Sequence, residues 1–368
     1  MKDNLTKEEM LNRLRTLKQM QVPCRSNFFY FTDTKRLKAI ENCLKDSPYY
    51  CIGKGKLFNL YGKEAAHPLK DADKILLIST HVDTVSNITK MSCLQNVKEG
   101  LLKGTFDNTV TNAVCVNMMK YQTLPDNVLF TFNGDEETGR CNGAKEVIKH
   151  LNRMGIESDR IIPVALDVTY EGYDKENDFT IENMFSDKID HPLIAFLDEA
   201  MGDDGKPFTN YTYVAPGRTC IPTNIPKDCI SKENSWYDEG VAYHSMGLPA
   251  FSFCIPCGEG DMHSNEGVLI HADTFLRYEQ SLTLLADGYT RFLENDRYKD
   301  VSLYVEKMPP SHFSSARYQI LFDEAEEEDE YAQGTFDFDD AYDSYHSDIA
   351  DLVDDIFREA ESYDGEER

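Results

Sequence analysis

The chain has 368 residues, enough for one large domain with its own hydrophobic core, which excludes a small scaffold held together by disulfides. A formal net charge of −27 speaks against nucleic acid as a partner, because most of this surface would repel a polyanion. No apolar stretch approaches the roughly 18 residues that a membrane helix needs. We therefore expect a soluble protein that binds neither nucleic acid nor membranes.

The chain opens with a charged, amphipathic stretch over residues 1–20 rather than with a secretory segment. Its ten cysteines are therefore expected to be reduced thiols in a cytoplasmic protein. Cys254 and Cys257 form a Cys-x-x-Cys pair. Because no second pair accompanies it, we interpret the two as ordinary cysteines at the end of a strand rather than as a zinc or redox site.

Apolar runs alternate with amphipathic stretches along the body of the chain. Runs that begin near residues 57, 74, 127, 160 and 249 are predicted strands, each near-continuously hydrophobic as parallel sheets require. Stretches that begin near residues 109, 143, 191 and 276 have apolar side chains at three- and four-residue spacing and are predicted helices. The alternation predicts an α/β fold, with a mixed, mostly parallel sheet covered by helices on both faces.

Composition separates this body from an acidic C-terminal tail. From residue 323 onward, twenty Asp and Glu stand against two Arg, so the tail carries −18 of net charge and the preceding residues carry −9. We expect one catalytic domain over residues 1–322, an acidic flexible linker over 323–346 and a short acidic amphipathic helix over 347–368. That helix either docks on the body of its own chain or binds a protein partner.

Two candidate metal ligands, His81 and Asp107, lie in the first third of the chain. His81 follows a predicted strand, and Asp83, two residues on, is placed to accept the second ring N–H of a metal-bound His81. A lone histidine at a strand end is more often structural. Asp107 stands just before a predicted helix, where it either caps that helix or bridges two metal ions through its two oxygens.

Carboxylates also follow two later strands. Glu136 and Glu137 lie side by side in a glycine-flanked turn, a pattern common in solvated loops. Alternatively, Glu137 binds a metal while Glu136 accepts a proton from metal-bound water and returns it to the leaving group. Asp167 ends a predicted strand, at the edge of a parallel sheet where ligands bind. If these strands are neighbours, one rim of the sheet gathers all of these side chains.

A third group of histidines lies near the end of the body. His263 follows the last predicted strand in a glycine-rich turn, whereas His244 lies in a helix-like stretch and His271 lacks such a turn. His263 is therefore the preferred ligand. Two zinc ions would bring four positive charges, and the three carboxylates together with a bridging hydroxide would balance them, which favours a site with two metals.

The order His-x-Asp, Asp, Glu-Glu, Asp, His resembles that of the co-catalytic di-zinc exopeptidases. This superfamily includes aminopeptidases, dipeptidases, tripeptidases and N-acyl-amino-acid deacylases. The resemblance implies that His81 binds one zinc ion, that His263 binds the other and that Asp107 bridges them. It also implies that Glu137 and Asp167 complete opposite metals. The expected cofactors are two Zn²⁺, with Co²⁺ or Mn²⁺ as alternatives.

The same resemblance assigns the catalytic roles, and it covers residues 57–285. It implies that Asp83 orients the first histidine and that Glu136 is the general acid/base. Metal-bound hydroxide would then attack the carbonyl of the bond that is cleaved. The zinc exopeptidase fold is accordingly the expected architecture.

Spacing distinguishes this chain from larger relatives. Only 95 residues separate Asp167 from His263, too few for the full lid domain that some relatives insert there. Another branch inserts a small β domain between His81 and Asp107, and the 25 residues found here are too few for that as well. We expect a compact catalytic domain with a modest insertion at about 172–229, where the alternation of strands and helices breaks down.

Three further residues are candidates for substrate binding. Arg218, in a glycine- and proline-rich loop, is placed to grip a substrate carboxylate, although an arginine in such a loop is more often a surface charge. Asp238 and Glu239 are candidates for holding a free α-amino group.

The sequence therefore predicts a two-zinc metallo-exopeptidase that cleaves a terminal peptide bond of short peptides, as an aminopeptidase or a di- or tripeptidase. A deacylase of N-acyl amino acids or another small amide is the nearest alternative, because it uses the same chemistry with a different pocket. An alternative of another class is a non-catalytic interaction protein on the same fold, which binds a partner through its acidic tail.

Overall fold

The structure is a computed structural model. It describes residues 5–22, 24, 34–63, 69, 72, 74–85, 88–89, 91, 100–182, 187–200, 210–214, 230–231 and 238–295. The predicted acidic linker at 323–346, the predicted helix at 347–368 and Arg218 lie outside the described residues.

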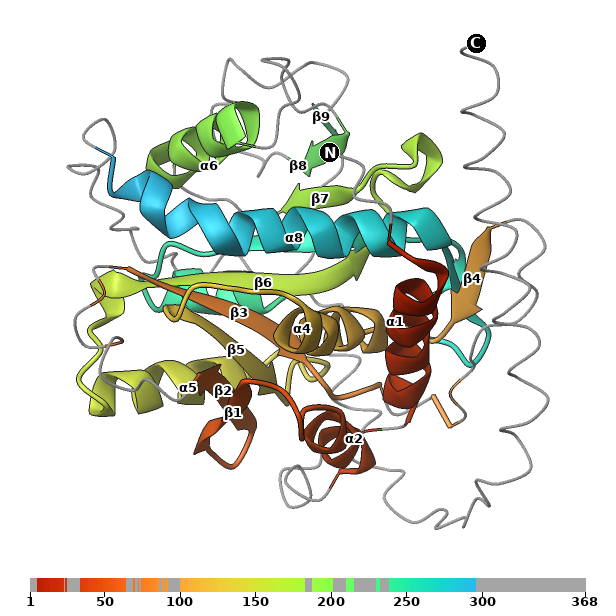
Figure 1. Cartoon of the computed structure of the whole chain (residues 1–368), viewed down its shortest axis with the longest axis horizontal. Coiled ribbons are helices and arrows are strands. Elements are labelled where there is room, and N and C mark those ends of the chain that lie inside the picture. Colours follow the sequence, from red (N-terminus) through yellow and green to blue (C-terminus); the bar gives the residue numbers. More distant parts are fainter. Residues whose placement is uncertain are drawn as a thin grey trace.

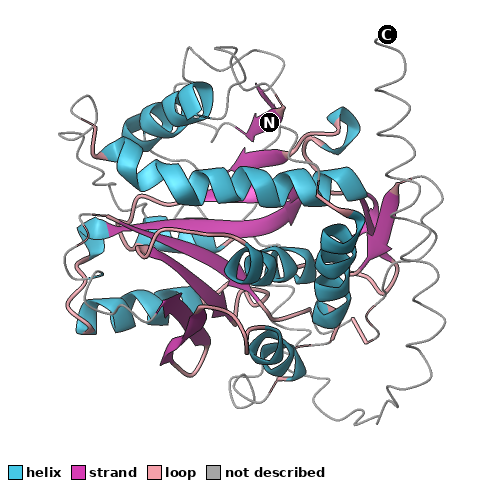
Figure 2. Cartoon of the chain, viewed as in Figure 1, coloured by secondary structure: helices cyan, strands magenta, loops and turns pink. Residues whose placement is uncertain are grey.

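Among the described residues, a nine-stranded mixed sheet forms the centre of the molecule, in the order β1-β2-β5-β3-β6-β10-β7-β8-β9 (Figures 1 and 2). Its strands are β1 (Tyr49–Lys54), β2 (Phe58–Lys63), β3 (Ile75–His81), β5 (Val128–Asn133), β6 (Ile161–Thr169), β7 (Phe179–Glu182), β8 (Tyr211–Val214), β9 (Ile230–Ser231) and β10 (Phe251–Pro256). Strands β5, β3, β6 and β10 pair in parallel, as do β7, β8 and β9. The prediction of a mixed, mostly parallel α/β sheet is confirmed.

The run near residue 57 is a strand, but the parallel pairing expected of it is wrong. It forms β2, which pairs antiparallel with β1 on one side and with β5 on the other. Five of its six residues are buried. The continuous apolar run therefore reflects burial on both faces of the strand and carries no information on the direction of pairing.

Helices cover both faces of the sheet. They are α1 (Lys7–Met20), α2 (Lys35–Cys43), α4 (Thr109–Tyr121), α5 (Asn142–Arg153), α6 (Asp187–Ala200), α7 (Glu239–Ser245) and α8 (Ala272–Leu293), with short 3-10 turns η2 (Ser158–Arg160) and η3 (Tyr173–Lys175). Side chains alternate along β3, so that Leu76 and Ile78 pack in the cluster with α4 and α8. Ile75 and Leu77 pack in the cluster with α5 and α7. Both faces of the central strand are therefore buried.

A second, small antiparallel sheet in the order β11-β12-β4 joins two distant segments. It consists of β4 (Leu101–Gly104), β11 (Gly258–Asp261) and β12 (Gly267–His271), and Val268 of β12 faces Gly104 of β4. Gly267 has φ 65°, and a Cβ there would lie 2.0 Å from the Gly104 carbonyl oxygen, so this close approach requires glycine. The sheet brings the segment before Asp107 beside the turn that carries His263.

Three further features bear on the sequence predictions. Within the expected insertion at 172–229, β7 and β8 extend the central sheet. In the part of the chain that the structure describes, no helix combines the length and the apolar character needed to cross a membrane. The seven cysteines among the described residues are free, and Cys254 and Cys257 are buried in and just after β10.

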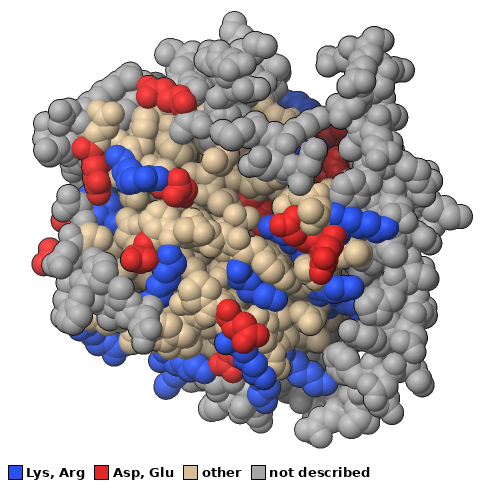
Figure 3. All heavy atoms as spheres, viewed as in Figure 1, with Lys and Arg blue, Asp and Glu red and all other residues tan. Residues whose placement is uncertain are grey.

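Most of the net negative charge lies near the C-terminus of the sequence, and the surface of the described residues carries both signs of charge. Figure 3 shows Lys and Arg side chains gathered along the lower edge of the described surface, with Asp and Glu scattered among them. The net charge of −27 resides mostly in the residues from 323 onward, which carry −18. The folded body is therefore far less acidic than the overall composition suggests.

Candidate metal centre

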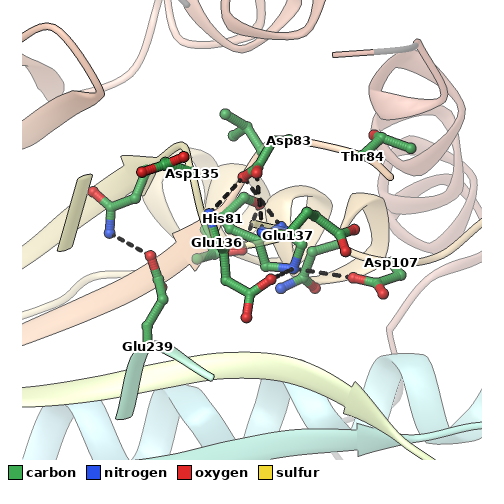
Figure 4. Close-up of polar contacts among 12 residues, drawn as sticks. His81, Asp83, Thr84, Asp107, Asp135, Glu136, Glu137 and Glu239 are labelled. Atoms are coloured by element: carbon green, nitrogen blue, oxygen red, sulfur yellow. Dashed lines mark hydrogen bonds and ion pairs between the residues drawn. The ribbon is translucent and has the colours of Figure 1, made fainter. Parts of the chain in front are cut away.

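The carboxyl ends of three neighbouring parallel strands meet at one edge of the sheet. His81 is the last residue of β3 and pairs in register with Asn133, the last residue of β5, while Thr80 pairs with Leu166 of β6. The turn after β5 carries Glu136 and Glu137, and the residue after Leu166 is Asp167. Strand pairing alone therefore brings candidates from three segments to the same place, and Figure 4 shows two of these segments, with His81 beside Glu136 and Glu137.

Asp107 lies between the two histidines. Its Oδ1 is 3.0 Å from Nε2 of His81, and its Oδ2 is 3.1 Å from Nε2 of His263. Asp107 is buried, whereas half of the His263 side chain is exposed. Each oxygen of one carboxylate thus faces a different imidazole, which is the arrangement that a ligand bridging two metals needs.

The remaining carboxylates add one oxygen to each side of this arrangement. Asp167 Oδ1 lies 3.7 Å from His81 Nε2, and Glu137 Oε2 lies 3.7 Å from His263 Nε2. Ligand atoms on one tetrahedral zinc ion, at about 2.0–2.2 Å from the metal, are roughly 3.3–3.6 Å apart. Glu137 also has an oxygen within 4.8 Å of the donor atoms of His81 and Asp107. The donor types and spacings fit zinc.

Three buried polar atoms at this edge lack a hydrogen bond of good geometry within the protein, although Asp107 Oδ1 lies 3.0 Å from His81 Nε2 and His81 Nδ1 lies 3.6 Å from Asp83. They are Nδ1 of His81, Oδ1 of Asp107 and Oε1 of Glu137. A buried polar atom without a partner costs roughly 1–3 kcal/mol, so such atoms are rare unless a ligand satisfies them. Three of them in one cluster favour a bound cation over a purely structural role.

The structural alternatives for the two carboxylate motifs do not fit. Asn108, rather than Asp107, is the N-cap residue of α4, and its side chain accepts no backbone N–H of the first helical turn. Glu136 is only 9% exposed and the Glu137 side chain only 7%, so their turn is not a solvated loop. Capping and solvation therefore explain neither motif.

Asp83 connects the first histidine to the glutamate turn. Its carboxylate accepts hydrogen bonds from the backbone N–H groups of Glu136, at 3.4 Å, and Glu137, at 3.1 Å. The same carboxylate lies 3.6 Å from Nδ1 of His81 (Figure 4). Glu136 extends its own Oε2 to 3.9 Å from Nε2 of that histidine. Asp83 is placed to orient the histidine while it fixes the turn.

The electrostatics of the metal-free cluster reflect this crowding. Burial, together with neighbouring carboxylates, raises the pKa of Glu136 and of Glu137 well above the ordinary value. For Asp107, burial alone would raise the pKa, but the two histidines outweigh it and lower the pKa. Burial opposes protonation of His263, yet Asp107 raises its pKa to about 9. Without metal, the cluster therefore holds protons that a cation would displace.

Three supporting residues could not be anticipated from the motifs. Asn112, on α4, donates to the backbone oxygen of His81 at 2.8 Å, and Asn108 donates to the Leu166 oxygen at 2.7 Å. The Tyr170 hydroxyl accepts the backbone N–H of Met262 at 3.0 Å and so ties down the turn before His263. The only hint that the sequence offers for the two asparagines is that these polar residues stand at the start of and within an otherwise apolar helical stretch.

The other predicted residues lie apart from this cluster. Asp238 is the N-cap of α7, where its carboxylate accepts N–H groups of the first turn. Glu239 is buried and bonds to Ser79 and Asn133, each at 2.8 Å. In these positions both carboxylates have partners within the protein, and the prediction that they hold a substrate amino group stays a prediction.

The two rival histidines occupy other environments. His244 is fully buried on α7, in the helix that packs on the face of the sheet opposite α4. His271 is the residue before α8, and its ring stacks on that of Tyr173 with the centroids 4.8 Å apart. Neither belongs to the group around Asp107 in the described structure.

Comparison with known proteins adds one family. Residues 64–212 match the profile of Peptidase family M28, a range that includes the first four predicted ligands but not His263. No curated protein sequence matches the chain.

Solved structures of low sequence identity resemble the chain. A tripeptidase from Staphylococcus aureus subsp. aureus Mu50 is 13% identical, covers 78% of this chain and 99% of its own, and has a TM-score of 0.48. The aminopeptidase PepT from Bacillus cereus ATCC 10987 is 11% identical, covers 78% of this chain and 99% of its own, and has a TM-score of 0.47. BSAP, a zinc aminopeptidase from Bacillus subtilis, is 14% identical, covers 68% of this chain and 53% of its own, and has a TM-score of 0.40.

Proposed function

Because residues 64–212 match Peptidase family M28 and the candidate ligands lie together, we propose that the chain is a two-zinc hydrolase that cleaves a terminal peptide bond of short peptides. The observation that carries the proposal is the position of Asp107. Its two oxygens face His81 Nε2 and His263 Nε2 at 3.0 and 3.1 Å. A carboxylate shared in this way serves two adjacent cations, because each oxygen has its own imidazole partner.

The donors fall into two groups around that shared carboxylate. His81 and Asp167 would complete one zinc site, and His263 and Glu137 the other. When bound, the zinc ions supply a Lewis acid for the scissile carbonyl and lower the pKa of a water molecule toward neutrality. Three ligand carboxylates bring three negative charges to this buried edge, which matches the donor set to a pair of divalent cations.

Glu136 is the proposed general acid/base. It lies beside the ligands, with Oε2 3.9 Å from His81 Nε2, while its backbone N–H is held by Asp83. A carboxylate in this position can accept a proton and later return it. Glu136 would take a proton from the attacking water and deliver it to the leaving amine.

A substrate panel tests this proposal. The full chain is incubated with Zn²⁺, Co²⁺ or Mn²⁺ and with dipeptides and tripeptides whose amino termini are free. The same peptides with blocked amino termini, and N-acyl amino acids, form the second set. We expect release of a terminal residue from the free peptides. Hydrolysis confined to the N-acyl set would replace the peptidase assignment with a deacylase, and no hydrolysis with any metal would contradict an enzymatic function.

A further inference from the structure

A buried arginine lies directly behind the candidate metal centre. Arg36, on α2, is fully buried. Its Nη1 donates to the backbone oxygen of Val82 at 2.7 Å, its Nη2 to the hydroxyl of Thr84 at 3.0 Å and its Nε to the Val22 oxygen at 3.0 Å. Two arms of the guanidinium therefore grip the loop after β3 on both sides of Asp83.

This grip is the first step in a continuous series of contacts that ends at the metal ligands. Asp83, between the two gripped residues, accepts the backbone N–H groups of Glu136 and Glu137 and faces Nδ1 of His81. A shift of the Val82–Thr84 loop would therefore move a carboxylate that orients one ligand and fixes the backbone of another.

Arg36 also has an electrostatic relation to the site. Burial lowers its pKa, and the charges of Cys24, Asp83, Asp107 and Glu137 oppose that shift. A guanidinium remains protonated in proteins, so Arg36 provides a fixed positive charge. The three ligand carboxylates and a bridging hydroxide together would balance two zinc ions, but Asp83 is a further, fully buried carboxylate. Arg36 supplies a positive charge that interacts with Asp83.

We propose that Arg36 is a positioning residue for zinc binding, which clamps the Val82–Thr84 loop and thereby holds His81 and Glu137 in the arrangement that receives the metal. The inference rests on the zinc site of the proposed function. Groups behind metal ligands typically change metal affinity by about 10–100-fold when they are removed, because they fix the orientation of the ligands.

The test is zinc affinity rather than turnover. Zinc is removed from the full chain and returned in competition with a chromogenic chelator, for the wild type and for Arg36→Lys. Lysine keeps the charge but cannot reach both acceptors with the planar fork of arginine. We expect zinc to bind at least about tenfold more weakly to Arg36→Lys than to the wild type. Circular dichroism of each metal-free protein establishes that it is folded before zinc is added.

A second variant covers the case in which Arg36→Lys fails to fold. Thr84→Val removes a single acceptor of the clamp and preserves shape and volume, so it should fold. We expect zinc binding to weaken about threefold, because one of two loop contacts remains.

Arg13→Lys is the matched control. Arg13 is also a buried arginine, but it pairs with Glu279 of α8 at 2.9 Å and its guanidinium lies over the ring of Tyr121. Tyr121 is the last residue of α4, roughly 18 Å along that helix from its first turn beside Asp107. The control should lose thermal stability and keep the zinc affinity of the wild type.

The outcomes separate the two claims. If the wild type binds no zinc, the proposed function fails. If the wild type binds zinc and both Arg36→Lys and Thr84→Val bind it equally tightly, only the positioning role is overturned. Equal weakening of zinc binding in Arg13→Lys would also overturn it, because the effect would then follow from lost stability.

Discussion

The two polar clusters near the carboxyl ends of β3 and β5 differ in whether their hydrogen bonds are complete. One is the candidate metal centre, built around Asp107 at the edge of the sheet. The other, which we call the α7 cluster, consists of Ser79, Asn133, Glu239 and Tyr243 and lies where α7 packs on the sheet. Both are buried and both contain a carboxylate, so burial and charge alone do not distinguish them.

Every polar group of the α7 cluster has a partner. The Asn133 amide donates to Ser79 and to Glu239, each at 2.8 Å, and its oxygen accepts from Thr131. The Ser79 hydroxyl donates to Glu239 and lies 2.7 Å from the Tyr243 hydroxyl, which can donate to it. Each hydrogen has an acceptor within the protein, so this cluster leaves nothing for a ligand to satisfy.

The candidate metal centre shows the opposite pattern. His81, Asp107 and Glu137 each retain a buried polar atom that lacks a hydrogen bond of good geometry within the protein. Burial, together with neighbouring carboxylates, raises the pKa of Glu136 and of Glu137 in this centre. Incomplete hydrogen bonding, more than acidity or burial, therefore distinguishes the candidate metal centre from the α7 cluster.

Turnover should separate the two clusters most strongly. Glu136→Gln keeps the size of the side chain but removes the proton acceptor, so kcat should fall by roughly 10³-fold or more. Glu239→Gln, the matched change in the α7 cluster, should reduce kcat less than about tenfold. Steady-state kinetics on a free tripeptide, with zinc content measured on the same samples, checks both. Full activity of Glu136→Gln would remove the proposed base.

Metal content should give the next largest difference. Asp107→Asn offers one oxygen and a nitrogen donor where two oxygens stood, so it cannot bridge two cations. We expect the bound zinc to fall from about two ions per chain to about one or fewer. Inductively coupled plasma mass spectrometry after gel filtration measures this content. If Asp107→Asn retains the zinc content of the wild type, Asp107 is not a bridging ligand.

The response to pH should sharpen the same contrast. Asp107 raises the pKa of His263 to about 9 in the metal-free protein, above the unfolded value of about 6.5. This group therefore stabilises the metal-free fold fully below about pH 6.5, and the stabilisation is lost as the pH rises through about 9. Zinc needs the neutral imidazole, so its affinity rises over the same interval.

Scanning calorimetry of zinc-loaded and metal-free protein measures the combined effect. The difference between their Tm values should widen steadily from about pH 6.5 to about pH 9. A difference that narrows over this interval would mean that His263 does not exchange its proton for the metal.

The smallest effect is expected in the α7 cluster. In the wild type, Ser79 and Asn133 each donate a hydrogen bond to one oxygen of Glu239. Glu239→Gln replaces one of these oxygens with an amide nitrogen, which cannot accept, so the free energy of unfolding should fall by roughly 1–3 kcal/mol. Zinc affinity should change less than about twofold. Urea unfolding and zinc competition on the same variant test this pair of expectations. If Glu239→Gln loses zinc while its stability is unchanged, the division between the two clusters is wrong.

Sequence reasoning reached the strand-end residues for a definite physical reason. Parallel strands expose their carboxyl ends at one edge, so apolar runs followed by His81 and Asp167 predict that the two side chains are neighbours. Motif order supplied Asp107 and His263, which the small sheet of β4 and β12 brings together. Their strands are short, and Gly267, with its positive φ, is a weak local signal for this pairing.

The contacts of Arg36 and Glu239 could not be predicted from the sequence, because they depend on packing between distant segments. Arg36 lies 46 residues before the Val82 oxygen that it binds, on a helix whose polar residues would ordinarily face solvent. Glu239 was assigned to substrate because acidic residues suggest binding of an amine. Only the packing of α7 on the sheet shows that its carboxylate is enclosed by Ser79 and Asn133.

Zinc-edge anomalous diffraction from crystals of the zinc-loaded protein locates the metal ions themselves. We expect two anomalous peaks about 3.5–4 Å apart, one on each side of the Asp107 carboxylate. One peak is expected beside His81 and Asp167, and the other beside His263 and Glu137. A single peak, or two peaks that do not share Asp107, would contradict the two-zinc site.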